Sequence, residues 1–223
     1  MRSIVKIKKL EQTIEFTSDG SLRFFFIGTG SAFAKKYFQN NVLIIKGKDH
    51  VLVDCGAVCP YAMYTYHSSI ASVRNLLITH SHADHIGGLE EVALVGRYTT
   101  KIRPKMVITD QYKKILWNQS LKGGCAYGEY TDGAFMTFED YFDQIKPRQI
   151  ARSPRPLYEA NVGSINVKLY RTHHIPDKTG SWRTSFYSVG VLIDDRILFP
   201  GDTQFDRELL DWMCGSYDVE YIF

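Results

Sequence analysis

The sequence contains no apolar run long enough to cross a bilayer. Its longest apolar stretches, such as residues 24–27 and 42–45, have the length of a β-strand, whereas a membrane-spanning helix needs about 20 apolar residues. The first residues do not resemble a secretory leader, because charged side chains from Lys6 to Glu11 interrupt every candidate apolar segment. We therefore expect a protein without membrane association.

The sequence also has few cysteines and little excess of one charge. The four cysteines are too few and too scattered for a disulfide framework, and Cys55 and Cys59 have no second pair with which to form a zinc ribbon. Lys and Arg number 27 against 24 Asp and Glu, and a net charge of +3 is too small for binding nucleic acid by bulk charge. We expect a cytoplasmic protein with no nucleic-acid partner.

The remaining composition is that of a globular α/β protein. Hydrophobic residues make up 44% of the 223 residues, and no linker or internal repeat divides them, so one domain over residues 1–223 is predicted. Strands are predicted at residues 22–27, 42–45, 51–53, 74–79, 105–109, 165–170, 186–193 and 196–199. Residues 165–170 alternate as in a half-buried strand.

Helices are predicted to follow three of these regions. One begins after Gly88, a second is expected to have Asp110 as its cap, and a third is expected to have Asp206 as its cap. Residues 125–141 are aromatic, broken by glycine and without clean periodicity. We expect this segment to run over the surface.

One short segment concentrates metal-binding side chains. Three of the seven histidines lie in Thr79-His80-Ser81-His82-Ala83-Asp84-His85, directly after a predicted strand. In an extended chain His80, His82 and Asp84 point to one side, and the turn into a helix brings His85 to the same cavity. Two imidazoles can hold one metal while the carboxylate and the third imidazole hold another, which suits phosphoester hydrolysis. The alternative is a solvated histidine-rich loop.

These residues resemble the signature of the metallo-β-lactamase superfamily, His-x-His-x-Asp-His followed by Ile-Gly-Gly. Residues 51–56 resemble its early strand that ends in an aspartate. His174-Ile175-Pro176 resembles its isolated histidine, and Gly201-Asp202-Thr203 resembles its bridging-aspartate motif. The resemblance implies an α/β fold, the four-layer αββα metallo-β-lactamase sandwich.

The resemblance also implies two divalent metal ions, Zn²⁺ or alternatively Mn²⁺. It implies two ligand sets that share one carboxylate: His80, His82, His174 and Asp202 for one metal, and Asp84, His85 and Asp202 for the other. Asp84 is the predicted catalytic residue, since it would orient the attacking water. Asp54 and Thr203 are expected to orient the ligands from behind. Two alternatives stay open, an ordinary turn aspartate at Asp202 and His173 in place of His174.

One departure from the superfamily pattern concerns the second metal. The pattern has a further histidine well after the bridging aspartate, but none of the 21 residues that follow Asp202 is a histidine. We therefore expect residues 1–223 to lack the C-terminal end of the fold, and the second metal site to be incomplete and weak.

A glycine-rich turn distinguishes the branches of the superfamily. Gly28-Thr29-Gly30-Ser31 resembles the turn of the phosphodiesterase branch, in which glycines let backbone N–H groups approach a phosphate. Gly28, Gly30 and Ser31 are therefore predicted to bind substrate. An ordinary turn is the alternative.

Within that branch, residues 82–96 and 171–190 resemble the anti-Pycsar phosphodiesterases, phage and bacterial proteins that destroy cyclic-nucleotide immune signals. The resemblance implies a homodimeric zinc hydrolase that opens 3′,5′-cyclic mononucleotides, including cyclic CMP and cyclic UMP, in the host cytoplasm where a phage encodes it. Such a substrate needs an aromatic side chain that stacks on the base, and we predict Tyr127 for this role. Ordinary packing is the alternative.

Two further functions remain as alternatives. One is a transfer-RNA 3′-processing endoribonuclease of the same superfamily, but the chain is short for the clamping arm of that family, and its charge is nearly neutral. Residues 146–156 form one basic stretch, for which a solvated connection is the simpler reading. The other is a non-catalytic protein that binds and sequesters a nucleotide.

Overall fold

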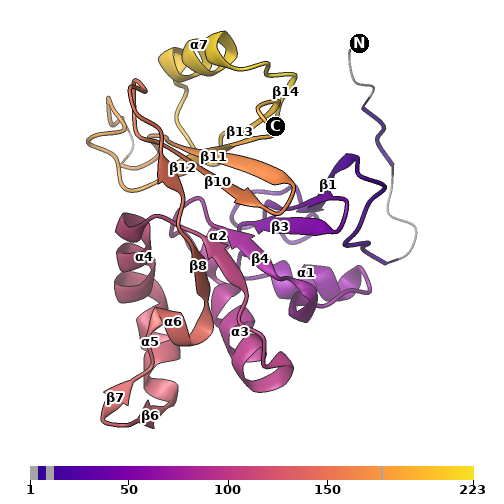
Figure 1. The fold of residues 1–223 in the computed structure, drawn as a ribbon, viewed down its shortest axis with the longest axis vertical. Coiled ribbons are helices and arrows are strands. Elements are labelled where there is room, and N and C mark those ends of the chain that lie inside the picture. The colour runs from indigo at the N-terminus through magenta and orange to yellow at the C-terminus, as the bar shows by residue number, and fades with distance from the viewer. Residues whose placement is uncertain (1–4, 9–12, 177) are drawn as a thin grey trace.

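The computed structural model describes residues 5–8, 13–176 and 178–223 of the chain. It contains two six-stranded sheets, which Figure 1 shows stacked on each other with helices on their outer sides. The main hydrophobic core takes side chains from both sheets and from the helices around them. The four-layer αββα arrangement predicted from the sequence is therefore confirmed.

The first sheet has the order β1-β2-β3-β4-β5-β8. Its strands are β1 (Leu22–Gly28), β2 (Asn41–Lys46), β3 (Asp49–Val53), β4 (Asn75–Leu77), β5 (Lys105–Val107) and β8 (Asp143–Ile145). The first three strands pair antiparallel, and β3, β4, β5 and β8 pair parallel. Because parallel neighbours need crossover connections, the helices follow these strands, and the loops after β3 and β4 meet at one edge of the sheet.

Helices and short helical turns make up these crossovers. They are α1 (Cys59–Thr65), η1 (Ile70–Ser72), α2 (Ala83–Ile86), α3 (Leu89–Leu94), η2 (Val95–Thr100), α4 (Asp110–Leu116), η3 (Trp117–Leu121), α5 (Lys122–Cys125), η4 (Ala126–Gly128) and α6 (Phe138–Tyr141). The expected cap of α4 is wrong by one residue. Thr109 is the cap, since its side chain accepts a hydrogen bond from the Tyr112 N–H, and Asp110 is the first helical residue.

The second sheet has the order β14-β13-β12-β11-β10-β9. Its strands are β9 (Arg148–Gln149), β10 (Leu157–Val162), β11 (Ile165–Arg171), β12 (Val189–Ile193), β13 (Ile197–Phe199) and β14 (Tyr221–Ile222). The expected hairpin between β12 and β13 is confirmed. Neighbours from β9 to β13 pair antiparallel, and β13 and β14 pair parallel.

Helix α7 (Arg207–Ser216) covers the outer face of this second sheet (Figure 1). Asp206 caps it as expected, because its carboxylate accepts the N–H of Leu209 at 3.0 Å. Leu209 and Met213 pack with Tyr170 of β11 in a second, smaller core. The expectation of a half-buried strand at residues 165–170 is therefore wrong, because α7 shields the side that alternation assigns to solvent.

Residues 125–141 contain a small hairpin as well as helical turns. Its strands are β6 (Tyr130–Thr131) and β7 (Ala134–Phe135), and all four of these residues are exposed. The hairpin therefore lies on the surface as predicted, but the expectation is wrong for the ends of the segment, where Cys125, Phe138 and Tyr141 pack in the main core. Figure 1 shows this hairpin at the lower end of the molecule, far from α2. Among the described residues, no helix has both the length and the apolar character needed to cross a membrane.

Candidate metal centre

The histidine-rich segment leaves the first sheet after β4 and enters α2 at Ala83. His80 is buried in the extended part, and His82 occupies the position before the helix. Because the helix begins at Ala83, Asp84 lies on its first turn beside His85. The expectation that Asp84 continues the extended run with His80 and His82 is therefore wrong, and Asp84 belongs with His85.

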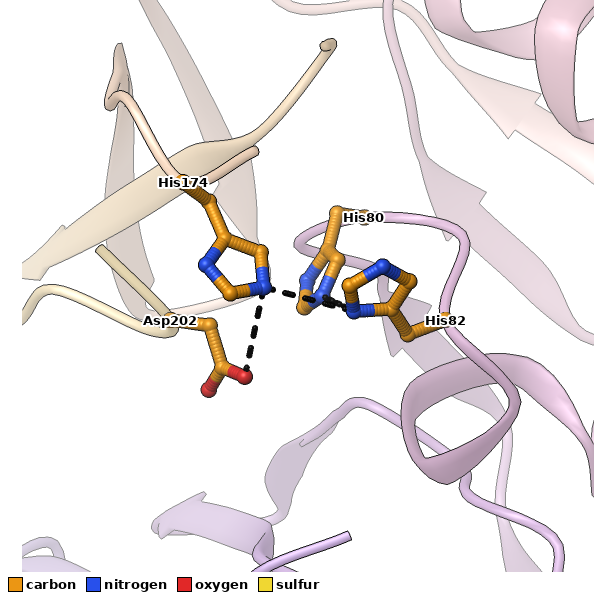
Figure 2. Close-up of side chains that lie close together, drawn as sticks. All are labelled: His80, His82, His174 and Asp202. Atoms are coloured by element: carbon orange, nitrogen blue, oxygen red, sulfur yellow. Dashed lines mark hydrogen bonds and ion pairs between the residues drawn. The ribbon is translucent and has the colours of Figure 1, made fainter. Parts of the chain in front are cut away.

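Four side chains form the first cluster, and Figure 2 shows them converging from the two halves of the chain. His80 Nε2 lies 3.0 Å from His82 Nδ1, which in turn lies 3.3 Å from His174 Nε2. The carboxylate of Asp202 lies 3.7 Å from His174 Nε2. Nitrogen ligands about 2.0–2.1 Å from a tetrahedral zinc ion are about 3.3 Å apart, so these spacings fit one metal ion.

A second cluster shares Asp202 with the first. His85 Nε2 lies 3.3 Å from Asp84 Oδ2 and 3.5 Å from Asp202 Oδ2. His85 of this cluster and His174 of the first cluster both lie near the same oxygen of Asp202, Oδ2. Together they form a His/Asp metal-binding centre, with hard oxygen and borderline nitrogen donors that suit zinc or manganese.

Asp54 stands behind the second cluster at the end of β3. Its Oδ2 lies 2.6 Å from His85 Nδ1, and its two oxygens also accept the backbone N–H and the hydroxyl of Thr79, each at 2.8 Å. Hydrogen bonding at Nδ1 leaves His85 Nε2 to face the metal cluster. Asp54 has φ +62°, an uncommon backbone conformation that turns its side chain into this position.

Burial and neighbouring charges shift the pKa values of three side chains in the centre. Burial lowers the pKa of His80 to about 2, and the neighbouring His85 adds to this effect, so His80 offers a neutral lone pair. Burial also acts against a charged His85, but Asp54 and Asp202 outweigh it and raise the pKa of His85 to about 10. The hydrogen bond from His85 lowers the pKa of Asp202 to about 2. The carboxylate that the two clusters share is therefore ionised.

The second half of the chain supplies His174 and Asp202 from two adjoining loops. Gly201 has φ +62°, a conformation that glycine adopts without strain, and this turn after β13 presents Asp202 to the centre. Thr203 donates its hydroxyl to the His173 carbonyl at 3.0 Å, so it ties the two loops together. Gln204, which the sequence did not single out, donates its side-chain amide to the His174 carbonyl at 2.9 Å.

His173 and His174 point to different places. His173 Nδ1 lies 3.2 Å from the Asp206 carboxylate, which also pairs with the buried Arg155 at 2.7 Å. Only His174 enters the cluster. Asp202 lies in a turn and at the centre at once, so the two readings of that residue describe the same position.

The glycine-rich turn after β1 is shaped by close backbone packing. A Cβ on Gly28 would lie 2.1 Å from the Gln39 carbonyl oxygen. A Cβ on Gly30 would lie 2.2 Å from the Cβ of Ala34. Neither glycine has a positive φ, so the requirement is room rather than a left-handed conformation. Ser31 follows in the same loop, and contact of these three residues with substrate stays a prediction.

Tyr127 lies on the surface next to the small hairpin. Its side chain is 58% exposed, and its ring packs against Phe135 of β7 at 4.9 Å. Figure 1 shows the hairpin on which Tyr127 packs at the end of the molecule away from α2. Contact of Tyr127 with a substrate base stays a prediction.

Solved structures share this fold. YhfI from Bacillus subtilis, a metallo-β-lactamase fold protein, matches with a TM-score of 0.59 and 14% identity over 84% of this chain, which spans 65% of YhfI. The short form of human tRNase Z matches with a TM-score of 0.53 and 17% identity, covering 80% of this chain and 68% of that one. The chain therefore has the metallo-β-lactamase fold and carries a His/Asp metal-binding cluster in it.

Sequence comparison places the chain within a narrower group. The family model described as anti-Pycsar protein Apyc1 matches residues 22–223. The anti-Pycsar protein Apyc1 of Paenibacillus sp. (strain J14) is 36% identical, covering 91% of this chain and 76% of the relative. That of Bacillus phage BSP38 is 34% identical, covering 83% and 70%. The chain belongs to the anti-Pycsar protein Apyc1 family, which confirms the resemblance seen in the sequence.

Proposed function

We propose that the chain is a metal-dependent phosphodiesterase that opens 3′,5′-cyclic mononucleotides, including cyclic CMP and cyclic UMP, and thereby counters the Pycsar antiphage defence. The observation that carries the proposal is the pair of ligand clusters joined at Asp202. Family membership supports the cyclic-nucleotide substrate. Relatives in Bacillus phages support a place of action in the cytoplasm of an infected host.

The chain's own ligands would hold two divalent cations, for which Zn²⁺ is the first candidate and Mn²⁺ the second. One cation would bind His80, His82, His174 and Asp202, and the other would bind Asp84, His85 and Asp202. Two cations in such a centre supply Lewis acidity, which activates water near neutral pH and offsets charge on a phosphate. The second set has three ligands among the described residues, one of them shared, so we expect weaker binding there.

The protein side chains around the cations have separate tasks. Asp84, on the first turn of α2 and only partly exposed, is proposed to accept a hydrogen bond from the attacking water and so orient it. Asp54 fixes the ring of His85, and Thr203 fixes the loop that carries His174. The turn at Gly28, Gly30 and Ser31 is proposed to present backbone N–H groups to the cyclic phosphate.

We also propose a homodimer. An exposed aromatic group around the small hairpin supports it, because Tyr127 and Tyr130 both pack on Phe135 at 4.9 Å while 48–64% of each side chain is exposed. Exposed aromatic clusters are typical of protein–protein contacts. Sedimentation of the purified chain, and of a Tyr127→Ser/Phe135→Ser variant, measures whether this surface contributes.

The substrate is tested by a side-by-side assay with zinc and manganese present. Cyclic CMP, cyclic UMP and a precursor transfer RNA are each incubated with the chain and with a His80→Ala/His82→Ala control. We expect linear nucleotide monophosphates from the cyclic substrates, intact transfer RNA, and no turnover by the control. Cleavage of the transfer RNA with intact cyclic nucleotides would support the endoribonuclease instead. Tight nucleotide binding without turnover would support a sequestering protein.

A further inference from the structure

Three buried side chains from distant segments stack in a column beside the metal centre. The rings of Tyr112 in α4 and Tyr187 before β12 lie parallel, with centroids 4.8 Å apart and 3° between their planes. The guanidinium of Arg171, at the end of β11, lies 4.6 Å from the Tyr187 ring centroid. None of the three residues is more than 8% exposed. We call this group the Arg171–Tyr187–Tyr112 column.

One end of the column contacts the histidine-rich segment. The hydroxyl of Tyr112 lies 3.0 Å from the Ser81 hydroxyl, and Ser81 is the residue between His80 and His82. Burial raises the pKa of Tyr112, so its hydroxyl keeps its proton and can donate it to Ser81. A contact at Ser81 restrains the backbone that separates the two imidazoles.

The other end of the column contacts the loop that begins at His174. Arg171 donates from Nε to the Ser188 carbonyl at 3.1 Å and from Nη2 to the carbonyls of Trp182 and Phe186 at 3.2 and 3.3 Å. These carbonyls lie in the second half of that loop, between Trp182 and the start of β12. The near end of the loop is tied by the His174 N–H, which donates to the Ser185 hydroxyl at 3.0 Å.

We propose that the Arg171–Tyr187–Tyr112 column is a positioning element that sets the spacing of the first metal cluster, with the Tyr112 hydroxyl acting through Ser81, the residue between His80 and His82. This inference rests on the proposed metal binding. Neither tyrosine belongs to the ligand sets. The stack joins α4 to the loop before β12, so it fixes the segment of His80 and His82 relative to the loop of His174. Restraint of ligands from outside the coordination sphere commonly changes metal affinity by 10–100-fold.

Two single-atom deletions separate positioning from packing. Tyr112→Phe and Tyr187→Phe each remove one hydroxyl and keep the stacked rings. The hydroxyl of Tyr187 lies 2.9 Å from that of Thr109, which caps α4. Tyr187→Phe therefore removes a hydroxyl of the column other than the one that contacts Ser81, and is the matched control.

The measurement is Zn²⁺ affinity of the purified chain by competition with a chromogenic chelator, with thermal unfolding recorded for each variant. We expect about a tenfold weaker first metal in Tyr112→Phe, an unchanged one in Tyr187→Phe, and similar unfolding temperatures. Ser81→Ala is expected to match Tyr112→Phe, and the double variant is expected to lose nothing further because both changes delete the same contact.

Wild-type affinity in Tyr112→Phe would overturn the proposal. Equal losses in Tyr112→Phe and Tyr187→Phe would also overturn it, because the column would then act through general packing. If the unaltered chain itself binds no Zn²⁺, the proposed metal centre fails rather than the column, so the two failures are distinguishable.

Discussion

Asp54 and His85 lie 31 positions apart in the sequence, yet Asp54 Oδ2 and His85 Nδ1 are 2.6 Å apart and both side chains are almost fully buried. β3 ends at Val53, directly before Asp54, and α2 carries His85 back across the same sheet edge. The backbone repeats the contact, because the Cys55 N–H donates to the His85 carbonyl at 2.8 Å. The orientation of His85, a candidate metal ligand, is therefore set by the pairing of two loops.

This contact predicts the effect of Asp54→Asn. The amide N–H₂ would donate to His85 Nδ1, and the proton of the neutral ring would move to Nε2, the atom that faces the second cluster. We expect turnover of cyclic nucleotide to fall at least tenfold, and the first, tighter metal to be retained. Steady-state kinetics and metal analysis measure both, with Asp110→Asn on the exposed start of α4 as the control. Equal loss of both metals would show that Asp54 supports the fold in general.

The first cluster predicts the result of changing His80 and His82 together to alanine. Two of its four ligands are then absent, and a metal held by one imidazole and a shared carboxylate binds weakly. Elemental analysis after purification without chelator should show loss of the more tightly held ion. Unchanged metal content would place the tight site elsewhere in the chain.

A buried ion pair predicts a large stability effect at the base of α7. Arg155 and Asp206 have side chains 6% and 9% exposed and lie 2.7 Å apart, and Asp206 also caps the helix. Burial works against a charged Asp206, but its contact with Arg155 keeps the pKa of this carboxyl below its usual value. Arg155→Met would leave that buried carboxylate with only the His173 ring and the Leu209 N–H beside it, and should lower the free energy of unfolding by about 3 kcal/mol.

Denaturant unfolding measures this change for Arg155→Met, for Asp206→Asn and for the double variant Arg155→Met/Asp206→Asn. Asn keeps the cap without a charge, so we expect the double variant to recover part of the loss. A double variant as unstable as the sum of the two single changes would contradict a direct interaction.

His50 predicts a stability difference that depends on pH. Its ring is buried, and its Nε2 accepts the Arg74 N–H at 2.9 Å. Burial, with the charge of Arg74, lowers the pKa of His50 from 6.5 to about 4. The unfolded chain therefore takes up the proton first as the pH falls, and stability is lost between pH 6.5 and pH 4.

The comparison of the unaltered chain with His50→Gln isolates this contribution. Between pH 7.5 and pH 5, we expect the unaltered chain to lose about 2 kcal/mol more than the variant, since all other titrating groups are common to both. Denaturant unfolding at the two pH values measures it. Parallel losses in both proteins would mean that His50 titrates normally in the folded state.

The sequence predicted the fold and the residues of the centre better than it predicted their local geometry. The spacing of His80, His82 and His85 is specific, and short strands alternating with helices leave few ways to bury their apolar faces. The sequence pattern placed Asp84 in an extended segment, whereas it lies in helix α2. The start of a helix cannot be fixed to within a few residues where no strong cap residue marks it. Gln204 was missed because a single glutamine in a loop has no pattern, and its partner carbonyl is 30 positions away.

Contacts between side chains far apart in the chain could not be predicted from the sequence either. Tyr112 and Tyr187 belong to different halves of the chain, and only the closed sandwich stacks them. The covered outer face of β11 was missed for the same reason, since alternation of side chains does not reveal that α7 lies over one side. Contacts between distant segments depend on the tertiary arrangement, which local periodicity does not contain.

The most direct test titrates Zn²⁺ into the metal-free chain while metal binding and turnover of cyclic UMP are followed in the same samples. We expect two binding phases, a tight one for the cluster of His80, His82 and His174 and a weaker one for the cluster of Asp84 and His85. Turnover to the linear monophosphate should follow the weaker phase and be absent before it. Full turnover at the first equivalent of metal, or none after both clusters have filled, would contradict a two-metal phosphodiesterase.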